Sequence, residues 1–307
     1  MKDSMTYNLN HLLSTRRGIV CLLALSAFSS IPYAFAGAQD HCASNIIEKI
    51  EELSSSRELV PTDRVPTISY RDVINGRIPQ FKKTPSFEFQ TPDGGFITVL
   101  DVSSSKVRDN PNLGRALKIW NIKVEREFRK RLAKFRSYFK NGGKRRLNSL
   151  DFPDRTVVIL KTKKSLNDGS PSVDSGMRIV FGRNSDEKLP FQQEFSDYNR
   201  AEVAAEIGRL YGPGDGPLLL HTGMRVIEQA PEVREVWVHT SWPHAKLYGR
   251  MGAKAETADI DVRDPLTLPY PVNVILRFDR EKVHGVIDKT KEQMSSSKKQ
   301  ILSQNAS

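Results

Sequence analysis

Cysteine is nearly absent from this chain, and so are the patterns that it usually forms. The 307 residues contain two cysteines, Cys21 and Cys42. Two cysteines cannot build a disulfide framework, and no cysteine or histidine spacing matches a structural zinc site. His221, His244 and His284 also lack the spacing of metal ligands. We therefore expect a fold that depends on its hydrophobic core, with no bound metal.

Long hydrophobic runs are also lacking, and hydrophobic residues make up 38% of the sequence. A chain of this length can bury a sizeable core, but so modest an apolar share indicates that some segments lie outside it. An apolar run at residues 18–28 is too short to span a membrane comfortably. The sequence therefore does not predict an integral membrane protein.

The N-terminus has the order of features typical of an export signal. Arg16 and Arg17 precede the apolar run, and Ala34-Phe35-Ala36 follows it as a small-residue cleavage site. We interpret residues 1–36 as a signal peptide and expect a periplasmic or secreted protein. Cleavage after Ala36 would leave Cys42 as the one remaining cysteine. The alternative is an apolar N-terminal helix of a cytosolic protein.

Acidic residues are outnumbered, 36 against 47 basic ones, which gives a net charge of +11. The excess is local, because the segment from Arg115 to Arg146 holds thirteen basic residues and two acidic ones. Apolar residues recur there at helical spacing, with no proline or glycine between Arg115 and Asn141: Leu113, Leu117, Trp120, Val124, Phe128, Leu132, Phe135 and Phe139. The pattern predicts a long amphipathic helix of about 29 residues, roughly 43 Å, within the basic segment at 112–146.

Such a basic surface attracts anionic partners. An acidic acyl-carrier protein, anionic lipid and lipopolysaccharide are all candidates for the helix at 112–146. Nucleic acid is not the expected partner, because no zinc spacing, RNA-binding signature or recognition-helix motif accompanies the charge. The alternative is a surface helix that lysine and arginine merely keep solvated.

The chain divides by composition into four parts. After the signal, residues 37–95 are polar and proline-rich, which predicts extended segments and turns. Residues 96–280 contain the convincing strands, at 96–102, 156–162, 176–182 and 273–278, and form the expected domain. Residues 281–307 are interpreted as a polar C-terminal tail, in part helical.

The residues from Ala201 to Lys254 alternate strands and helices. A strand at 201–210 leads into a turn rich in glycine and proline, and Asp215 or Gly216 can cap a helix that has Pro217 in its first turn. A second strand at 233–240 and a short helix ending at Gly252 follow. This alternation predicts a parallel pair of strands with crossover connections. Ligands of such units bind beyond the carboxyl ends of the strands, so we expect an anion site at residues 212–216.

Two motifs in this stretch resemble the core of the GNAT acyltransferase superfamily. Arg209-x-x-Gly212-x-Gly214 resembles the turn that cradles the pyrophosphate of coenzyme A, and residues 245–252, AKLYGRMG, resemble the A-x-L-Y-x-x-x-G helix. Three further segments resemble the N-acyl amino acid synthase and acyl-homoserine-lactone synthase branch: Glu206 to Leu210 (E-x-x-R-L), Gly176 to Val180, and Leu189-Pro190-Phe191, where Gln192 replaces the expected acid. Pro213 removes an amide donor from the turn, and Asp215 adds a carboxylate.

The resemblance implies an α/β fold, a GNAT-like mixed central sheet flanked by helices, here with a long basic amphipathic helix. It also implies an N-acyltransferase that moves an acyl group from acyl-CoA or an acyl-carrier-protein thioester to a small-molecule or peptide amine, with no metal. The expected cofactor-binding residues are those of the turn: Arg209, Leu210, Tyr211, Gly212, Gly214 and Gly216.

Acyl transfer to an amine needs a base for the amine proton and an acid for the leaving thiolate. Tyr248 occupies the place where many enzymes of the superfamily keep the acid, and Glu206 is the first candidate for the base, with His239 as another. Each has a structural alternative: Tyr248 as a packing residue, Glu206 as an ion-pair partner of Arg178 or Arg209, and His239 as a satisfied structural histidine.

An exported protein does not readily meet cytosolic acyl thioesters, which keeps a second function open. In this alternative the chain is a non-catalytic exported module of the same fold that binds anionic envelope or nucleic-acid partners through the helix at 112–146.

Overall fold

The computed structural model describes seven parts of the chain: residues 64–81, 83–133, 153–169, 172–193, 198–212, 214–256 and 273–304. The predicted signal peptide at 1–36 lies outside these residues, as does the second half of the predicted basic helix. Within the described residues no helix is both long and apolar enough to cross a membrane.

Nine strands of the described residues form one mixed sheet, in the order β1-β2-β3-β4-β5-β6-β7-β9-β8. Strands β2 to β6 are antiparallel neighbours, β6 and β7 are parallel, and β9 lies antiparallel between β7 and β8. The strands are β1 Thr67–Ile68, β2 Ser86–Gln90, β3 Phe96–Asp101, β4 Thr156–Thr162, β5 Val173–Gly182, β6 Ala204–Tyr211, β7 Glu235–Ser241, β8 Lys254–Ala255 and β9 Asn273–Asp279.

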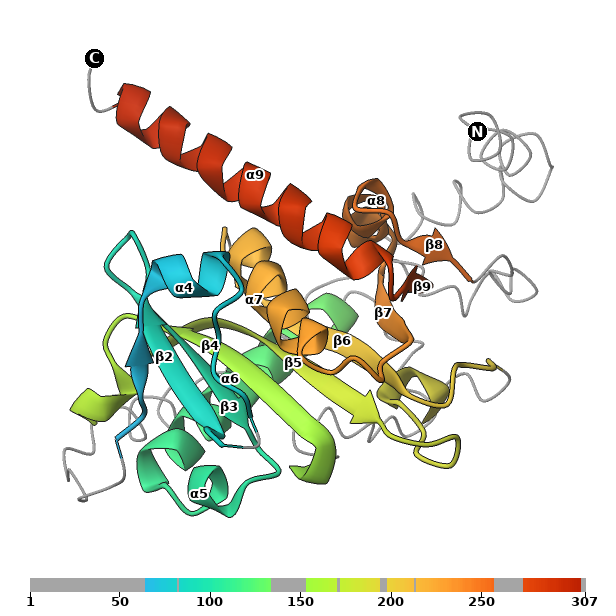
Figure 1. The fold of residues 1–307 in the computed structure, drawn as a ribbon, viewed down its shortest axis with the longest axis horizontal. Helices are drawn as coiled ribbons and strands as arrows, with labels where there is room; N and C mark the ends of the chain where they lie inside the picture. Colours follow the sequence, from blue (N-terminus) through green and yellow to red (C-terminus); the bar gives the residue numbers. More distant parts are fainter. Residues whose placement is uncertain are drawn as a thin grey trace, which may run out of the picture.

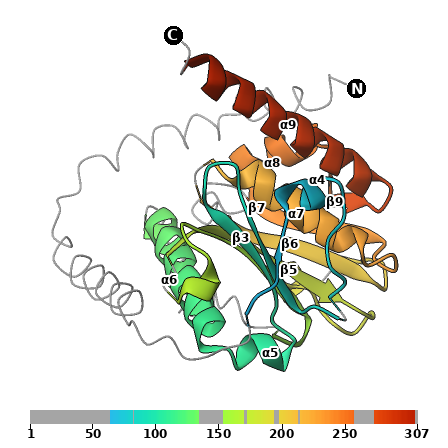
Figure 2. The same cartoon turned by 60° about the vertical axis from the view of Figure 1, so that its left-hand side comes forward.

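Helices cover both faces of the sheet. Figure 2 shows the sheet standing between α6 on one side and α7, α8 and α9 on the other, and Figure 1 shows α7 lying across β5 and β6. The α-helices are α4 Tyr70–Ile74, α5 Ser105–Arg108, α6 Pro111–Ala133, α7 Gly216–Glu228, α8 Trp242–Arg250 and α9 Lys282–Gln304, and short 3-10 helices lie at η3 Pro153–Arg155, η4 Leu166–Asp168 and η5 Pro190–Gln193. The predicted fold class, a mixed central sheet flanked by helices, is confirmed.

Alternation along the strands gives the sheet two apolar faces. Ala205 and Ile207 of β6, and Val236 and Val238 of β7, belong to the main hydrophobic cluster with α7 and α9. The residues between them point to the opposite face, which α5 and α6 cover farther along the sheet. We call these the α7 face and the α6 face.

The basic helix begins as predicted. Leu113, Leu117, Trp120 and Val124 of α6 are buried, and Trp120 is fully so. These residues pack on the α6 face against β3, β4 and the start of β5. The described part of the helix ends at Ala133, so the continuation predicted to residue 146 stays a prediction.

Two segments expected to lie outside the domain contribute to its core. In the proline-rich part, Phe87 and Phe89 of β2 are fully buried, with β2 paired to β3. In the expected polar tail, residues 282–304 form α9, whose Val286 and Ile287 are fully buried against α7. The packed unit therefore extends beyond residues 96–280 in both directions.

Candidate functional site

The parallel strands β6 and β7 pair over half of their length and then diverge. Their register runs from Ala204 opposite Glu235 to Ile207 opposite Val238. Beyond that point the end of β6 pairs with β5, and the end of β7 pairs with β9. The two strands therefore part where each is held by its outer neighbour. The parallel arrangement predicted from the sequence is confirmed, and the separation begins at Gly208.

A β-bulge on β6 lies where the strands part. Arg178 faces Gly208 and Gly176 faces Tyr211, so two residues of β6, Arg209 and Leu210, stand opposite one residue of β5. Arg209 has a φ of 55°, in the left-handed region that only a few non-glycine residues adopt. This bulge does not follow from the strand pattern, and Gly208 is the one local signal that could have indicated it.

The side chain of Arg209 points to the α6 face. Its Nη1 donates a hydrogen bond to Asn121 Oδ1 of α6, at 3.1 Å. This contact ties the bulge to the helix that begins the basic segment. The expected cofactor-binding arginine therefore lies on the opposite face from α7, at whose start the phosphates were expected.

Gly212 makes the turn after β6 possible. Its φ is 126°, and a Cβ on this residue would lie 2.0 Å from Ser175 Cβ. Any side chain would therefore collide with β5, so this position requires glycine. The main chain of the turn passes directly over Ser175 before α7 begins at Gly216.

Asp215 is the N-cap residue of α7, but its side chain does not cap the helix. Its Oδ1 lies 2.6 Å from Lys161 Nζ of β4, and its Oδ2 accepts a hydrogen bond of 2.8 Å from Ser175 Oγ. Lys161 also contacts Asp93 in the β2–β3 turn, at 2.6 Å. Burial alone would lower the pKa of Lys161, but the two carboxylates raise it above its ordinary value. The carboxylate noted in the sequence is thus tied to a largely buried lysine 54 positions away.

Glu206 and His239 lie on the α6 face of the diverging pair. Glu206 is 3% exposed, and its Oε2 accepts a hydrogen bond of 2.8 Å from the Phe191 main-chain amide. Its Oε1 lies 3.7 Å, and Arg178 Nη2 lies 3.8 Å, from the point where a Cβ of Gly208 would stand. The carboxylate of Glu206 and the guanidinium of Arg178 therefore both lie beside Gly208, where a Cβ would make ordinary contacts with them. His239 is two residues beyond Trp237, which is the partner of Glu206 in the register.

Tyr248 lies on the other face. It is 3% exposed, belongs to the α7-face cluster, and packs its ring edge-on against Phe278, with centroids 6.5 Å apart. Burial raises the pKa of its phenol to about 12. The structure thus brings Glu206 and Arg178 together, with His239 on the same face, and places Tyr248 across the sheet from them.

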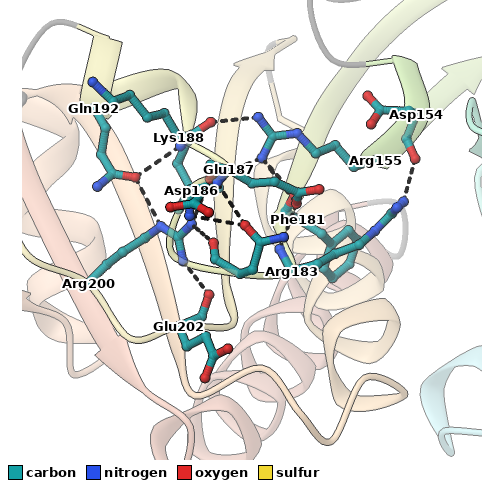
Figure 3. Close-up of polar contacts among 12 residues, drawn as sticks. Asp154, Arg155, Phe181, Arg183, Asp186, Glu187, Lys188, Gln192, Arg200 and Glu202 are labelled. Carbon is teal, nitrogen blue, oxygen red and sulfur yellow. Dashed lines mark hydrogen bonds and ion pairs between the residues drawn. The ribbon is translucent and has the colours of Figure 1, made fainter.

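Two arginines that the sequence analysis did not single out fix the loop that contacts Glu206. Arg155 donates to the main-chain carbonyls of Phe181, Glu187 and Lys188, at 3.1, 3.2 and 2.6 Å. Arg200 donates to the carbonyls of Asn184 and Glu187, each at 2.6 Å, and to Gln192 Oε1 at 3.0 Å. Figure 3 shows the two guanidinium groups converging on the loop at Glu187 and Lys188. Burial lowers the pKa of both arginines.

This anchored loop delivers an aromatic cluster to the α6 face. Phe191, which follows the anchored residues, stacks on Trp237 with ring centroids 4.8 Å apart and an interplanar angle of 22°. Tyr198 meets both rings edge-on. The Leu189-Pro190-Phe191 segment, noted in the sequence for its resemblance to the synthases, therefore supplies the amide that donates to Glu206 and the ring that stacks on Trp237.

Among the described residues, no group of three or more histidine, cysteine, aspartate or glutamate side chains is placed to hold a metal ion. The residues that could hold a cofactor are those of the turn after β6 and the start of α7.

Comparison with known proteins gives matches of structure alone. No protein-family model and no curated protein sequence matches the chain. FeeM, an N-acyl amino acid synthase from uncultured soil microbes, has 9% identity and a TM-score of 0.33, with 51% of this chain and 93% of FeeM covered. MesI, a CoA-dependent acyl-homoserine lactone synthase, has 18% identity and a TM-score of 0.31, covering 57% of this chain and 91% of its own.

A third similar structure is FdhC, a nucleotide-linked sugar GNAT, with 11% identity and a TM-score of 0.27 over 57% of this chain and 74% of FdhC. At these identities and TM-scores we transfer no activity from the matches to this chain. The function below is inferred from its own residues.

Proposed function

We propose that this chain is an N-acyltransferase of the GNAT-like type, which moves an acyl group from an acyl thioester to an amine. The observation that carries the proposal is the parallel pair β6 and β7, which diverges at a bulge and leads through a glycine turn into α7. Nucleotide-linked ligands commonly bind where two parallel strands diverge and a helix begins just beyond their carboxyl ends. The donor is proposed to be acyl-CoA or an acyl-carrier-protein thioester.

In this proposal the thioester lies between the ends of β6 and β7. The bulge interrupts the β5–β6 ladder, so the main-chain amide of Leu210 can donate a hydrogen bond to the thioester oxygen as charge develops on it. The main chain of Gly212, Gly214 and Gly216 receives the donor's phosphates. Arg209 holds the bulge against α6 through its contact with Asn121.

Glu206 is the proposed base. It is buried on the α6 face, and its Oε2 is oriented by the Phe191 amide. A carboxylate held in this way can accept the amine proton, directly or through a water molecule, while the small-molecule or peptide acceptor enters from the α6 face. His239, on the neighbouring strand of the same face, is the second candidate for the base.

Tyr248 has a narrower proposed role than that of a general acid. Its phenol has a pKa of about 12. Full transfer of its proton to a thiolate whose conjugate acid has a pKa of about 8.5 would be uphill by about 5 kcal/mol. We propose that Tyr248 stays protonated and supports the leaving thiolate by hydrogen bonding, after its ring turns from Phe278 toward the separated strands.

Thiol release from acetyl-CoA, long-chain acyl-CoA and an acyl-carrier-protein thioester, with an amine mixture as acceptor, tests the activity. Glu206→Gln is expected to lower kcat by about 100-fold or more. Glu202→Gln is the matched control, because Glu202 is exposed and lies four residues earlier in the chain. If the wild type releases thiol from none of these donors, the proposal is refuted.

A second function is favoured by one observation, the contact of Asp215 with Lys161 and Ser175 at the start of α7. A turn that holds its own carboxylate suits a module that has lost its cofactor. In that case the basic helix predicted at 112–146 would bind an acidic carrier protein, anionic lipid or lipopolysaccharide. Salt-sensitive binding to anionic vesicles, together with no thiol release, would support this function.

Export is also proposed, on the basis of the sequence features at residues 1–36. Mass spectrometry of the chain purified from its native host tests it: a mature N-terminus at Gly37 is expected, and an intact N-terminus would contradict it. The result also decides whether cytosolic thioesters can reach the mature chain.

A further inference from the structure

The carboxylate of Asp215 is held from two sides at the mouth of the proposed donor site. Lys161 Nζ lies 2.6 Å from Oδ1, and Ser175 Oγ donates to Oδ2 at 2.8 Å. The side chains of Lys161 and Asp215 are 12% and 17% exposed. These donors come from β4 and β5, two strands that are not part of the diverging pair. The contact therefore fastens the turn after β6 to the middle of the sheet.

The partners of this carboxylate are those that a phosphate would use. An ammonium and a hydroxyl that converge on two oxygens of one anion bind a phosphate oxygen pair by the same charge-assisted hydrogen bonds. The carboxylate also stands at the N-terminal end of α7, where a negative charge is favoured, although it makes no capping hydrogen bond there. Asp215 thus occupies the position of an anionic ligand while belonging to the chain itself.

The second carboxylate on Lys161 differs in its position. Asp93 contacts Lys161 Nζ at 2.6 Å, but its side chain is 61% exposed, and it belongs to the β2–β3 turn. Release of Asp93 from the lysine would not move the turn that leads into α7, whereas release of Asp215 would. Two carboxylates on one ammonium therefore offer a matched pair for experiment.

We propose that Asp215 is an autoinhibitory latch of the donor site, and that Lys161 exchanges this carboxylate for a phosphate of the acyl-CoA donor. The inference rests on the proposed function and adds a regulatory contact to it. In the latched state Asp215 fills the anion position and holds the turn down on Ser175. Donor binding displaces the carboxylate, and Lys161 with Ser175 then binds the donor's pyrophosphate. No covalent step is involved.

Isothermal titration of the full chain with coenzyme A tests the latch. Asp215→Asn keeps the shape of the side chain but removes its charge, so it is expected to bind coenzyme A about tenfold more tightly than the wild type. Asp93→Asn, the matched control, is expected to leave the affinity within about twofold, because Asp93 is mostly exposed. Adding Lys161→Met to Asp215→Asn is expected to abolish the gain. Thermal melts check that each variant is folded.

Pantetheine, which lacks the phosphates, separates the latch from a general change in the site. Its affinity is expected to be equal in the wild type and Asp215→Asn. Equal affinity of these two proteins for coenzyme A would overturn the latch while leaving the acyltransferase proposal intact. A gain for pantetheine as large as that for coenzyme A would also overturn it. Failure of every variant to bind coenzyme A, together with no thiol release from any donor, would overturn both proposals.

Discussion

Acidification is expected to destabilise the protein through His221, a buried histidine between α7 and α9. The His221 side chain is fully buried, and its Nδ1 lies 3.0 Å from Thr290 Oγ1 and 3.3 Å from the Ile287 carbonyl oxygen of α9. Burial lowers its pKa from 6.5 to about 4, and the positive charges of Arg225 and Lys291 act in the same direction. The folded protein therefore favours a neutral imidazole at this position.

The size of the effect follows from the two pKa values. The unfolded chain binds a proton at His221 near pH 6.5 and the folded chain near pH 4, so the unfolded state holds more protons between these values. The contribution to stability is complete above pH 6.5 and is lost as the pH falls to 4. This difference between the folded-state and unfolded-state pKa corresponds to about 3 kcal/mol in the free energy of unfolding. That is a large part of the 5–15 kcal/mol, roughly, by which a typical domain is stable.

Urea denaturation from about pH 7 to about pH 4 measures this loss. The free energy of unfolding of the wild type should fall more steeply with acid than that of His221→Gln, since the variant has no imidazole to protonate. His284→Gln is the control, because His284 also belongs to the α7–α9 contact but its side chain is 70% exposed. If the wild type and His221→Gln lose stability in parallel, the reasoning is refuted.

Three further predictions concern the turn, the last helix and the anchored loop. Gly212→Ala should cost about 3 kcal/mol or more in urea denaturation, because its Cβ would stand 2.0 Å from Ser175 Cβ at a φ of 126°. Gly214→Ala, with a φ of 84° and open space, should cost about 1–2 kcal/mol. Ile287→Ala removes a fully buried side chain of α9 and should cost about 2–5 kcal/mol by the same measurement. Arg200→Lys removes the guanidinium group that holds the loop carbonyls, and it should speed proteolysis at residues 183–193. An unchanged rate of proteolysis would show that these hydrogen bonds do not hold the loop.

Features that depend on local patterns could be predicted from the sequence. Thr156–Thr162 is a strand with the expected bounds, and α7 begins at Gly216 with Asp215 as its N-cap residue. The parallel pairing of β6 and β7 followed from strands that alternate with helices. Apolar spacing identified the buried residues at the start of α6. In each case the signal lies within about 20 residues of the feature that it predicts.

Features that depend on distant partners could not be predicted in this way. The contact of Asp215 with Lys161 joins residues 54 positions apart, and no sequence pattern pairs them. The left-handed bulge at Arg209 depends on register with β5, and the face on which Tyr248 packs depends on Phe278 of β9. These properties arise only when the strands are assembled.

Two segments that were placed outside the domain had core signals that composition obscured. In the proline-rich part, Phe87 and Phe89 flank Glu88 in the alternation of a strand, although five prolines surround the segment. In α9 the buried side chains are few and lie near its start, so the many lysines and serines that follow made the segment resemble a tail. A short apolar stripe is enough to attach a helix when the receiving surface is itself apolar.

Strand β9 is synthesised after both of its neighbours in the sheet, and this order has a consequence for the growing chain. From β1 to β7 each strand lies beside its predecessor, but β9 must enter between β7 and β8. Until Asn273–Asp279 has left the ribosome, β7 presents a row of main-chain hydrogen-bonding groups along its outer side. A truncated or stalled polypeptide that stops before residue 273 should therefore self-associate. In a polypeptide that includes β9, the outer edge of β7 is already paired.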